Sequence, residues 1–220
     1  MVYYHDVHTI NSYTSMSTHL DTFKSHIDII RGMGYQIVRE FSGNDKEIRI
    51  GFDDGFRGVY ENKEFFLTNH IPVTIFIPTS LVNSYGYLTM EEIIELERLG
   101  FNIQSHGVRH KDMTKMDITT LKDDLTTSKK FLETLLCKPI DEICFPMGYF
   151  SDQVIEESLN SGYTLLFSSM PSPSKKFPKN LLGRIFLQPL TNIQVKLSIL
   201  SRQMALQAHY KSLHYKQKTI

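Results

Sequence analysis

Two adjacent carboxylates, Asp53 and Asp54, follow a short apolar stretch and precede a glycine in residues 48–55, Ile-Arg-Ile-Gly-Phe-Asp-Asp-Gly. The alternation of isoleucine with Arg49 predicts a strand that stops at the pair. Successive side chains of an extended segment point in different directions. One carboxylate could therefore hold a metal while the other moves protons. An ordinary Asp-Gly turn, in which Asp closes the loop and Gly takes positive φ, would explain the same residues.

Two histidines four positions apart, His106 and His110, occur in Ser-His-Gly-Val-Arg-His at residues 105–110. They follow a predicted strand, enclose Gly107 and lack the glutamate of the helical zinc-protease pattern, so we expect a loop at a strand end. Two imidazoles and one carboxylate are a common set of ligands for a divalent metal and suit zinc with a coordination position left open. Solvent-facing histidines in a polar loop are the alternative.

A third strand-to-loop segment is Cys-Phe-Pro-Met-Gly-Tyr at residues 144–149. It is either a plain turn or the wall of a groove whose backbone N–H groups can bind an oxyanion.

The elements that position these segments alternate between strand and helix. Predicted strands cover residues 2–4, 48–52, 73–77, 101–104, 143–145, 165–167 and 181–187. The first predicted helix is capped by Thr18 and ends at Gly32, and another begins at the Thr89/Glu92 capping box and ends at Gly100. Further helices are predicted over residues 59–67, 121–136 and 154–162. The last predicted helix runs from Ile193 to Met204. Residues 168–179 are rich in Pro, Ser and Lys and predict an exposed loop or lid. Such alternation predicts an α/β fold with a mostly parallel sheet, and the number of units favours a small or incomplete barrel.

The order and spacing of the three segments resemble the polysaccharide deacetylase family, the NodB-homology enzymes of carbohydrate esterase family 4. The resemblance rests on Phe-Asp-Asp-Gly at 52–55, Ser105-His106 with His110, and the Pro-x-Gly loop at Pro146. It extends over about residues 2–187 and includes the approach to His106 from Leu88. It implies a distorted, incomplete (β/α)7-type barrel. We expect a single domain over residues 1–220, with a core at about 2–187 and a C-terminal helix at about 191–208.

Carried onto this chain, the resemblance assigns a role to each segment. The metal ligands would be Asp54, His106 and His110. Asp53 would be the general base that deprotonates a metal-bound water, and the backbone N–H of Met147 would be the oxyanion donor. The rest of the third segment would contact the substrate: Pro146, Gly148 and Tyr149. Zinc is the expected metal, with cobalt, nickel or manganese as alternatives.

The chain departs from the family pattern at three places. Cys144 stands where relatives often carry an arginine that orients the base, no tryptophan is present, and no histidine occurs between His110 and His209 to supply a late general acid. The circularly permuted, poly-N-acetylglucosamine deacetylase-like subgroup carries a Tyr-His pair on its first strand, as residues 2–5 do here. We therefore expect His5 to be the general acid, with a surface histidine as the alternative. Arg184 is the candidate to replace the missing arginine, and a surface cation is its alternative.

The charge balance, 24 basic against 24 acidic residues, gives no indication of a nucleic-acid partner. Two cysteines seven positions apart exclude a disulfide framework. No signal-peptide pattern or bilayer-spanning stretch is evident, so we expect a cytoplasmic protein, which could lie at the periphery of a polysaccharide-synthesis system. The predicted function is metal-dependent removal of acetyl groups, chiefly N-acetyl, from a sugar or glycan. The alternatives are a carbohydrate-binding relative with weakened catalysis and a metal-dependent amidohydrolase that cleaves another C–N bond. The oligomeric state is left open.

Overall fold

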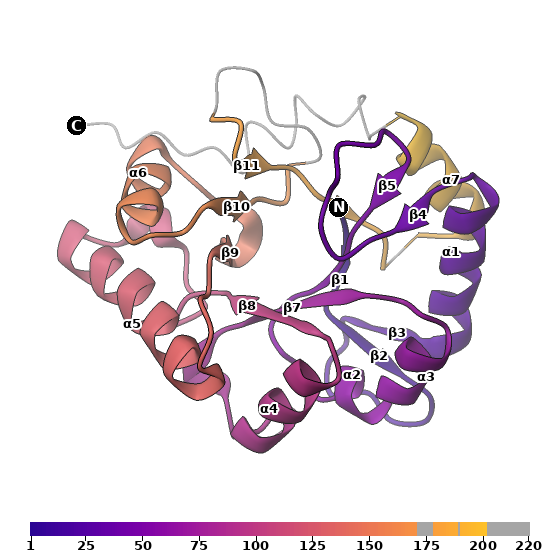
Figure 1. Ribbon diagram of the computed structural model, residues 1–220, viewed down its shortest axis with the longest axis horizontal. Helices are drawn as coiled ribbons and strands as arrows, with labels where there is room; N and C mark the ends of the chain where they lie inside the picture. The colour runs from indigo at the N-terminus through magenta and orange to yellow at the C-terminus, as the bar shows by residue number, and fades with distance from the viewer. Residues whose placement is uncertain (171–177, 189, 202–220) are drawn as a thin grey trace.

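The structure is a computed structural model that describes residues 1–170, 178–188 and 190–201. Its centre is an eight-stranded sheet in which every described pair of neighbours is parallel, in the order β11-β10-β9-β8-β7-β6-β1-β12 (Figure 1). The strands are β1 (Val2–Tyr4), β6 (Ile50–Phe52), β7 (Val73–Ile77), β8 (Asn102–Ser105), β9 (Glu142–Cys144), β10 (Leu165–Phe167), β11 (Leu181–Leu182) and β12 (Ile185–Phe186). Two small parallel pairs lie beside it: β2 (Asp6–His8) with β3 (Ser17–His19), and β4 (Gln36–Ile37) with β5 (Glu47–Ile48).

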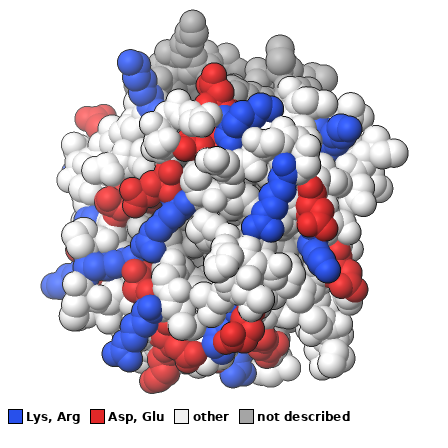
Figure 2. All heavy atoms as spheres, turned by 45° about the vertical axis from the view of Figure 1, so that its right-hand side comes forward, with Lys and Arg blue, Asp and Glu red and all other residues white. Residues whose placement is uncertain are grey.

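Helices surround the sheet (Figure 1). The α-helices of the described residues are α1 (Leu20–Gly32), α2 (Gly58–Glu61), α3 (Lys63–Thr68), α4 (Met90–Arg98), α5 (Ile118–Leu136), α6 (Asp152–Asn160) and α7 (Asn192–Ser201). Short 3-10 turns occupy Thr79–Leu81, Met113–Lys115 and Pro146–Gly148. None of the described helices has the length and apolar character needed to cross a membrane. On the face shown in Figure 2, acidic and basic side chains are interspersed.

Side-chain contacts across its concave face show that the sheet is strongly curled. Arg49, directly before β6, forms an ion pair with Glu142 of β9, at 2.7 Å between Nη2 and Oε2. Three strand spacings in a flat sheet would separate these positions by about 14 Å. The rings of Phe76 on β7 and Phe167 on β10 likewise approach to 5.3 Å between centroids. The sheet is therefore an incomplete parallel barrel, and the predicted fold is confirmed.

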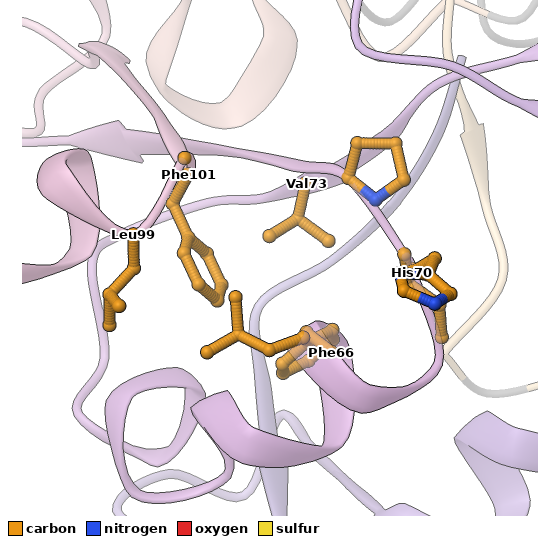
Figure 3. A pocket seen from close by; sticks show the side chains of 9 residues that line it. Phe66, His70, Val73, Leu99 and Phe101 are labelled. Atoms are coloured by element: carbon orange, nitrogen blue, oxygen red, sulfur yellow. The ribbon is translucent and has the colours of Figure 1, made fainter.

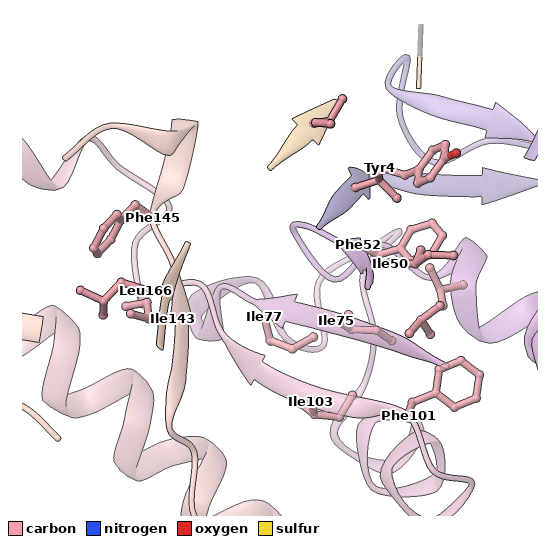
Figure 4. Close-up of a cluster of buried hydrophobic side chains, with 14 of the residues drawn as sticks. Tyr4, Ile50, Phe52, Ile75, Ile77, Phe101, Ile103, Ile143, Phe145 and Leu166 are labelled. Atoms are coloured by element: carbon pink, nitrogen blue, oxygen red, sulfur yellow. The ribbon is translucent and has the colours of Figure 1, made fainter. Parts of the chain in front are cut away.

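Alternation along the strands divides apolar side chains between the barrel interior and the layer beneath the helices. On β7, Ile75 and Ile77 belong to the large outer cluster (Figure 4). Phe76 packs in a separate inner cluster with Cys144. Each fully buried side chain of this kind contributes about 1.5–3 kcal/mol of transfer free energy. Burial on both faces explains why β7 is an almost continuous apolar run.

Several predicted boundaries need correction. The first helix is capped by His19, which accepts from the N–H of Asp21, because Thr18 is held in β3 opposite Val7. The strand predicted over 48–52 is divided into β5 and β6, and the one over 181–187 into β11 and β12. The strands β2, β3 and β4 were not predicted. Part of the predicted loop or lid (171–177), and residues 202–208 of the predicted C-terminal helix, lie outside the described residues.

Candidate active site and metal centre

The predicted site residues gather at the carboxyl ends of the parallel strands, the edge where α/β proteins hold their reactive groups. They come from the ends of β1, β6, β8 and β9, and from the segment before β12. A pocket of about 270 Å³ opens there. It is lined by Tyr3, His5, Met16, Asp53, Asp54, His106, His110, Met147, Gly148 and Ser169.

Asp54, His106 and His110 form one compact set of ligands. Oδ1 of Asp54 lies 2.9 Å from Nε2 of His110 and 3.4 Å from Nε2 of His106. Nδ1 of His106 contacts the carbonyl oxygen of Cys144 at 2.6 Å, which fixes the ring and directs Nε2 towards Asp54. One potential ligand atom from each of the three residues lies within 4.8 Å of the others.

The electrostatics of this set fit a divalent cation. Oδ1 of Asp54 is buried and makes no hydrogen bond of normal geometry within the described residues, although two imidazole nitrogens lie 2.9 and 3.4 Å from it. Burial raises the pKa of Asp54, but His106 and His110 outweigh it and bring this pKa far below its usual range. The contact with Asp54 raises the pKa of His110. An ionised carboxylate between two imidazoles is the arrangement that a bound divalent metal requires.

A second triplet, Asp53, His106 and Cys144, also brings its potential ligand atoms within 4.8 Å of one another. A cysteine binds metal as the thiolate, and burial raises the pKa of the Cys144 thiol well above its usual value. Both oxygens of Asp53 already accept hydrogen bonds from Arg184. The set centred on Asp54 is therefore the better candidate.

Asp53 and Arg184 form a buried bidentate ion pair. Nη1 and Nη2 of Arg184 donate to Oδ1 and Oδ2 of Asp53 at 2.6 and 2.8 Å. The guanidinium also lies over the ring of Tyr3, at 4.1 Å from the centroid. Burial raises the pKa of Asp53, but the charge and hydrogen bonds of Arg184 outweigh it and lower this pKa below its usual value. Asp53 is therefore a carboxylate at neutral pH, held in one orientation.

His5 reaches the pocket from the end of β1. Its backbone N–H donates to Oε1 of Gln188 at 3.1 Å, and its Nδ1 lies 3.3 Å from the same oxygen. The ring also contacts Phe186 edge-on, at 5.3 Å between centroids. The strand order places β1 between β6 and β12, so the first strand of the chain delivers His5 next to Asp53.

The third segment bends sharply beside the pocket. Met147 and Gly148 both have positive φ, 60° and 68°. A Cβ atom on Gly148 would lie 2.3 Å from Oγ of Ser169, so only glycine fits this position. Met147 and Gly148 line the pocket, whereas the buried Pro146 and the half-buried Tyr149 are not among the lining residues.

Asp124 of α5 holds the loop that carries the two histidines, and sequence reasoning missed it. Its carboxylate accepts from the backbone N–H groups of Val108 and Arg109 at 2.8 and 3.2 Å, and from Nη1 of Arg109 at 3.0 Å. A Cβ on Gly107 would lie 2.5 Å from its Oδ1. A signal was present, because Asp124 falls on the buried helix face between Leu121 and Leu125. Gln188, Tyr3, Met16 and Ser169 were missed as well.

A second hollow, also about 270 Å³, lies at the opposite, amino ends of β7 and β8 (Figure 3). Its wall is mainly apolar, with Phe66, Val73, Leu99 and Phe101 around it, and His70 is the only titratable residue among those that line it. It lacks the clustered acids and imidazoles of the first pocket.

The family model described as "Polysaccharide deacetylase" matches residues 42–166, more than half of the chain. The chain belongs to the polysaccharide deacetylase family. The family match includes Asp53, Asp54, both histidines and the third segment, whereas His5 and Arg184 lie outside it. Assignment to the permuted subgroup remains a prediction.

Individual relatives are distant in sequence and similar in fold. The YxkH protein of Bacillus subtilis (strain 168) is 21% identical over 180 residues, which are 77% of this chain and 64% of that protein. The chain thus spans less than two thirds of this relative. The Streptococcus pyogenes deacetylase PplD, solved in complex with acetate, matches with a TM-score of 0.79 and 19% identity, covering 90% of this chain and 95% of that one. IcaB from Ammonifex degensii matches with a TM-score of 0.74 and 18% identity, over 89% and 95% of the two chains.

Proposed function

We propose that the chain hydrolyses acetyl groups, chiefly N-acetyl groups, on a sugar or polysaccharide, with the help of a divalent metal. One observation carries the proposal: a carboxylate with two imidazoles lies beside the ion-paired carboxylate of Asp53 in a single pocket. Membership of the polysaccharide deacetylase family supports a sugar substrate. The deacetylase PplD was solved in complex with acetate, and acetate is the product that this reaction would release.

The residues that would hold the metal are Asp54, His106 and His110. A bound divalent cation would polarise a carbonyl group and lower the pKa of a bound water towards about 7. A mixed set of one oxygen and two nitrogen ligands accepts zinc, and also cobalt, nickel or manganese. The carbonyl of Cys144 and the carboxylate of Asp124 support this set through His106 and the loop that follows it.

Asp53 accepts the proton of the attacking water. Its lowered pKa keeps it ionised, and Oδ1, which accepts one hydrogen bond from Arg184, has a second lone pair with which to accept the proton. Arg184 is a positioning residue, because it fixes the direction of this carboxylate without lining the pocket. A base held in place contributes about 10²–10⁴-fold to the rate.

Two further groups complete the reaction. The backbone N–H of Met147 stabilises negative charge on the carbonyl oxygen. His5 then donates a proton to the nitrogen of the leaving amine, since a free amide anion is too poor a leaving group. Gln188 orients His5 through Nδ1, which assigns the donating role to Nε2.

Acetate release tests the proposal. Purified protein is treated with a chelator, dialysed, and incubated with N-acetylglucosamine, a chitin oligosaccharide, an O-acetylated sugar and a cyclic amide, with and without added Zn²⁺, Co²⁺, Ni²⁺ or Mn²⁺. We expect acetate from an acetylated sugar only after metal is restored. Sugar binding without release would favour the weakened relative, and ring opening of the cyclic amide alone would favour the amidohydrolase. Either result would overturn the proposal.

A further inference from the structure

An aromatic pair, the half-buried Tyr13 and the exposed Tyr85, lies on two connections that border the catalytic pocket without lining it. Tyr13, in the connection between β2 and β3, meets Tyr85, in the connection before α4. Their rings make an edge-to-face contact, with 6.2 Å between centroids and 79° between planes. Tyr85 is 95% exposed, although aromatic side chains of this size usually bury most of their surface.

The pair is held by specific contacts. The hydroxyl of Tyr13 donates to Glu61 of α2. Its ring packs against Gly86, where an added Cβ would lie 3.1 Å from Cδ1 of Tyr13 and φ is +83°. Tyr13 is therefore fixed from two sides where it meets Tyr85. A glycine at position 86 lets the two connections approach closely.

The same connections lead directly to the catalytic residues. The N–H of Arg57 donates to the carbonyl of Gly86 at 2.9 Å, and the N–H of Leu88 donates to that of Gly55 at 3.0 Å. These bonds join the connection that carries Tyr85 to the turn that follows Asp53 and Asp54. Met16, from the connection that carries Tyr13, lines the pocket itself.

We propose that Tyr13 and Tyr85 form a second sugar subsite, which binds a pyranose ring of the glycan next to the unit whose acetyl group enters the pocket. This inference rests on the proposed function and narrows its substrate to an oligosaccharide or polysaccharide. Tyrosine suits such a ligand, because its face packs against the apolar C–H faces of a sugar while its hydroxyl and polar neighbours meet the sugar hydroxyls. The polar neighbours are the exposed Arg57, Glu61 and Ser84. An aromatic pair with polar and charged residues close to it in the chain fits a sugar better than a broad apolar partner surface.

The test compares substrate lengths. The value of kcat/KM for acetate release is measured on N-acetylglucosamine and on a chitin oligosaccharide, for wild type, Tyr85→Ala, Tyr85→Phe and Ile193→Ala. Wild type should have a higher kcat/KM on the oligosaccharide than on N-acetylglucosamine. In Tyr85→Ala the ratio of these two values should fall about tenfold, equivalent to about 1.4 kcal/mol. Tyr85→Phe, which keeps the ring, should retain most of the wild-type ratio. Ile193 is 75% exposed on α7 and serves as the control for removal of an exposed apolar side chain.

Equal losses on both substrates, or an unchanged preference in Tyr85→Ala, would overturn the subsite while leaving the deacetylase proposal intact. If wild type releases acetate from no substrate, the proposed function fails, and calorimetric titration with the oligosaccharide still decides the subsite. Weaker binding by Tyr85→Ala than by wild type would support it. Equal affinity, or binding by neither protein, would contradict it.

Discussion

Arg184 binds both carboxylate oxygens of Asp53 across a separation of 131 residues. The two side chains are almost fully buried, at 1% and 4% exposure. A pair of this kind depends on both partners, because removing one leaves an uncompensated charge that costs about 3–5 kcal/mol. The sulfur of Cys144 lies 3.8 Å from Asp53 Oδ2, so the thiol fills space beside a base that a distant arginine orients.

Arg184→Met should therefore reduce activity and change its pH dependence. Arg184 outweighs the effect of burial on Asp53 and lowers the pKa of this carboxyl. Without Arg184, burial dominates and the pKa of Asp53 rises, so the acid limb of kcat/KM moves to higher pH. Arg184→Lys keeps the charge and should move this limb less. An unchanged acid limb in Arg184→Met would show that Asp53 is not the base.

His5→Gln should lower kcat by about 10²–10⁴-fold if His5 protonates the leaving amine. The loss should be much smaller on an acetyl ester with a good leaving group, which departs without a proton. Gln188→Ala, which removes the partner of Nδ1, should give an intermediate loss on the amide substrate. Equal losses on amide and activated ester would assign His5 to binding or structure instead.

Asp124→Ala should weaken metal binding, although Asp124 is not a proposed ligand. It accepts two backbone N–H groups in the loop between His106 and His110, and supporting residues of this kind are worth about 10–100-fold in metal affinity. Zinc competition with a chromophoric chelator measures the change. Asp123→Ala, which removes the neighbouring and more exposed partner of Arg109, is the matched control. Equal effects of the two substitutions would contradict the role of Asp124.

Asp6→Asn should stabilise the protein at neutral pH. Asp6 is fully buried, and burial raises its pKa from 3.8 to about 6. Between these two values the native state binds more protons than the unfolded state, so the free energy of unfolding falls as pH rises from about 4 to 6. This difference corresponds to about 3 kcal/mol. Chemical denaturation at pH 4.5 and 7.5 should show a flatter profile for Asp6→Asn, and an identical profile would contradict the raised pKa.

The segments at the strand ends that carry the two aspartates and the two histidines were predictable, because each pattern is contained in a few consecutive residues. A strand, two acids and a glycine, or a strand followed by spaced histidines, can be recognised within a few residues. The capping box of Thr89 and Glu92 was predictable for the same reason, and both of its hydrogen bonds are present.

The remaining features depend on contacts between distant parts of the chain. Arg184 was a candidate only through the family pattern, and nothing near Gln188 in the sequence identifies His5 as its partner. Thr18 resembled a helix cap, but pairing of β3 with β2 placed it in a strand.

The central claim is that Asp54, His106 and His110 hold a divalent metal while Asp53 supplies the base. Metal content by mass spectrometry and acetate release, both measured on Asp53→Asn after zinc loading, test this division most directly. We predict wild-type zinc stoichiometry with turnover reduced at least about 10²-fold, whereas the control Asp54→Asn loses the metal together with activity. Full turnover in Asp53→Asn, or zinc retained by Asp54→Asn at wild-type affinity, would contradict the account.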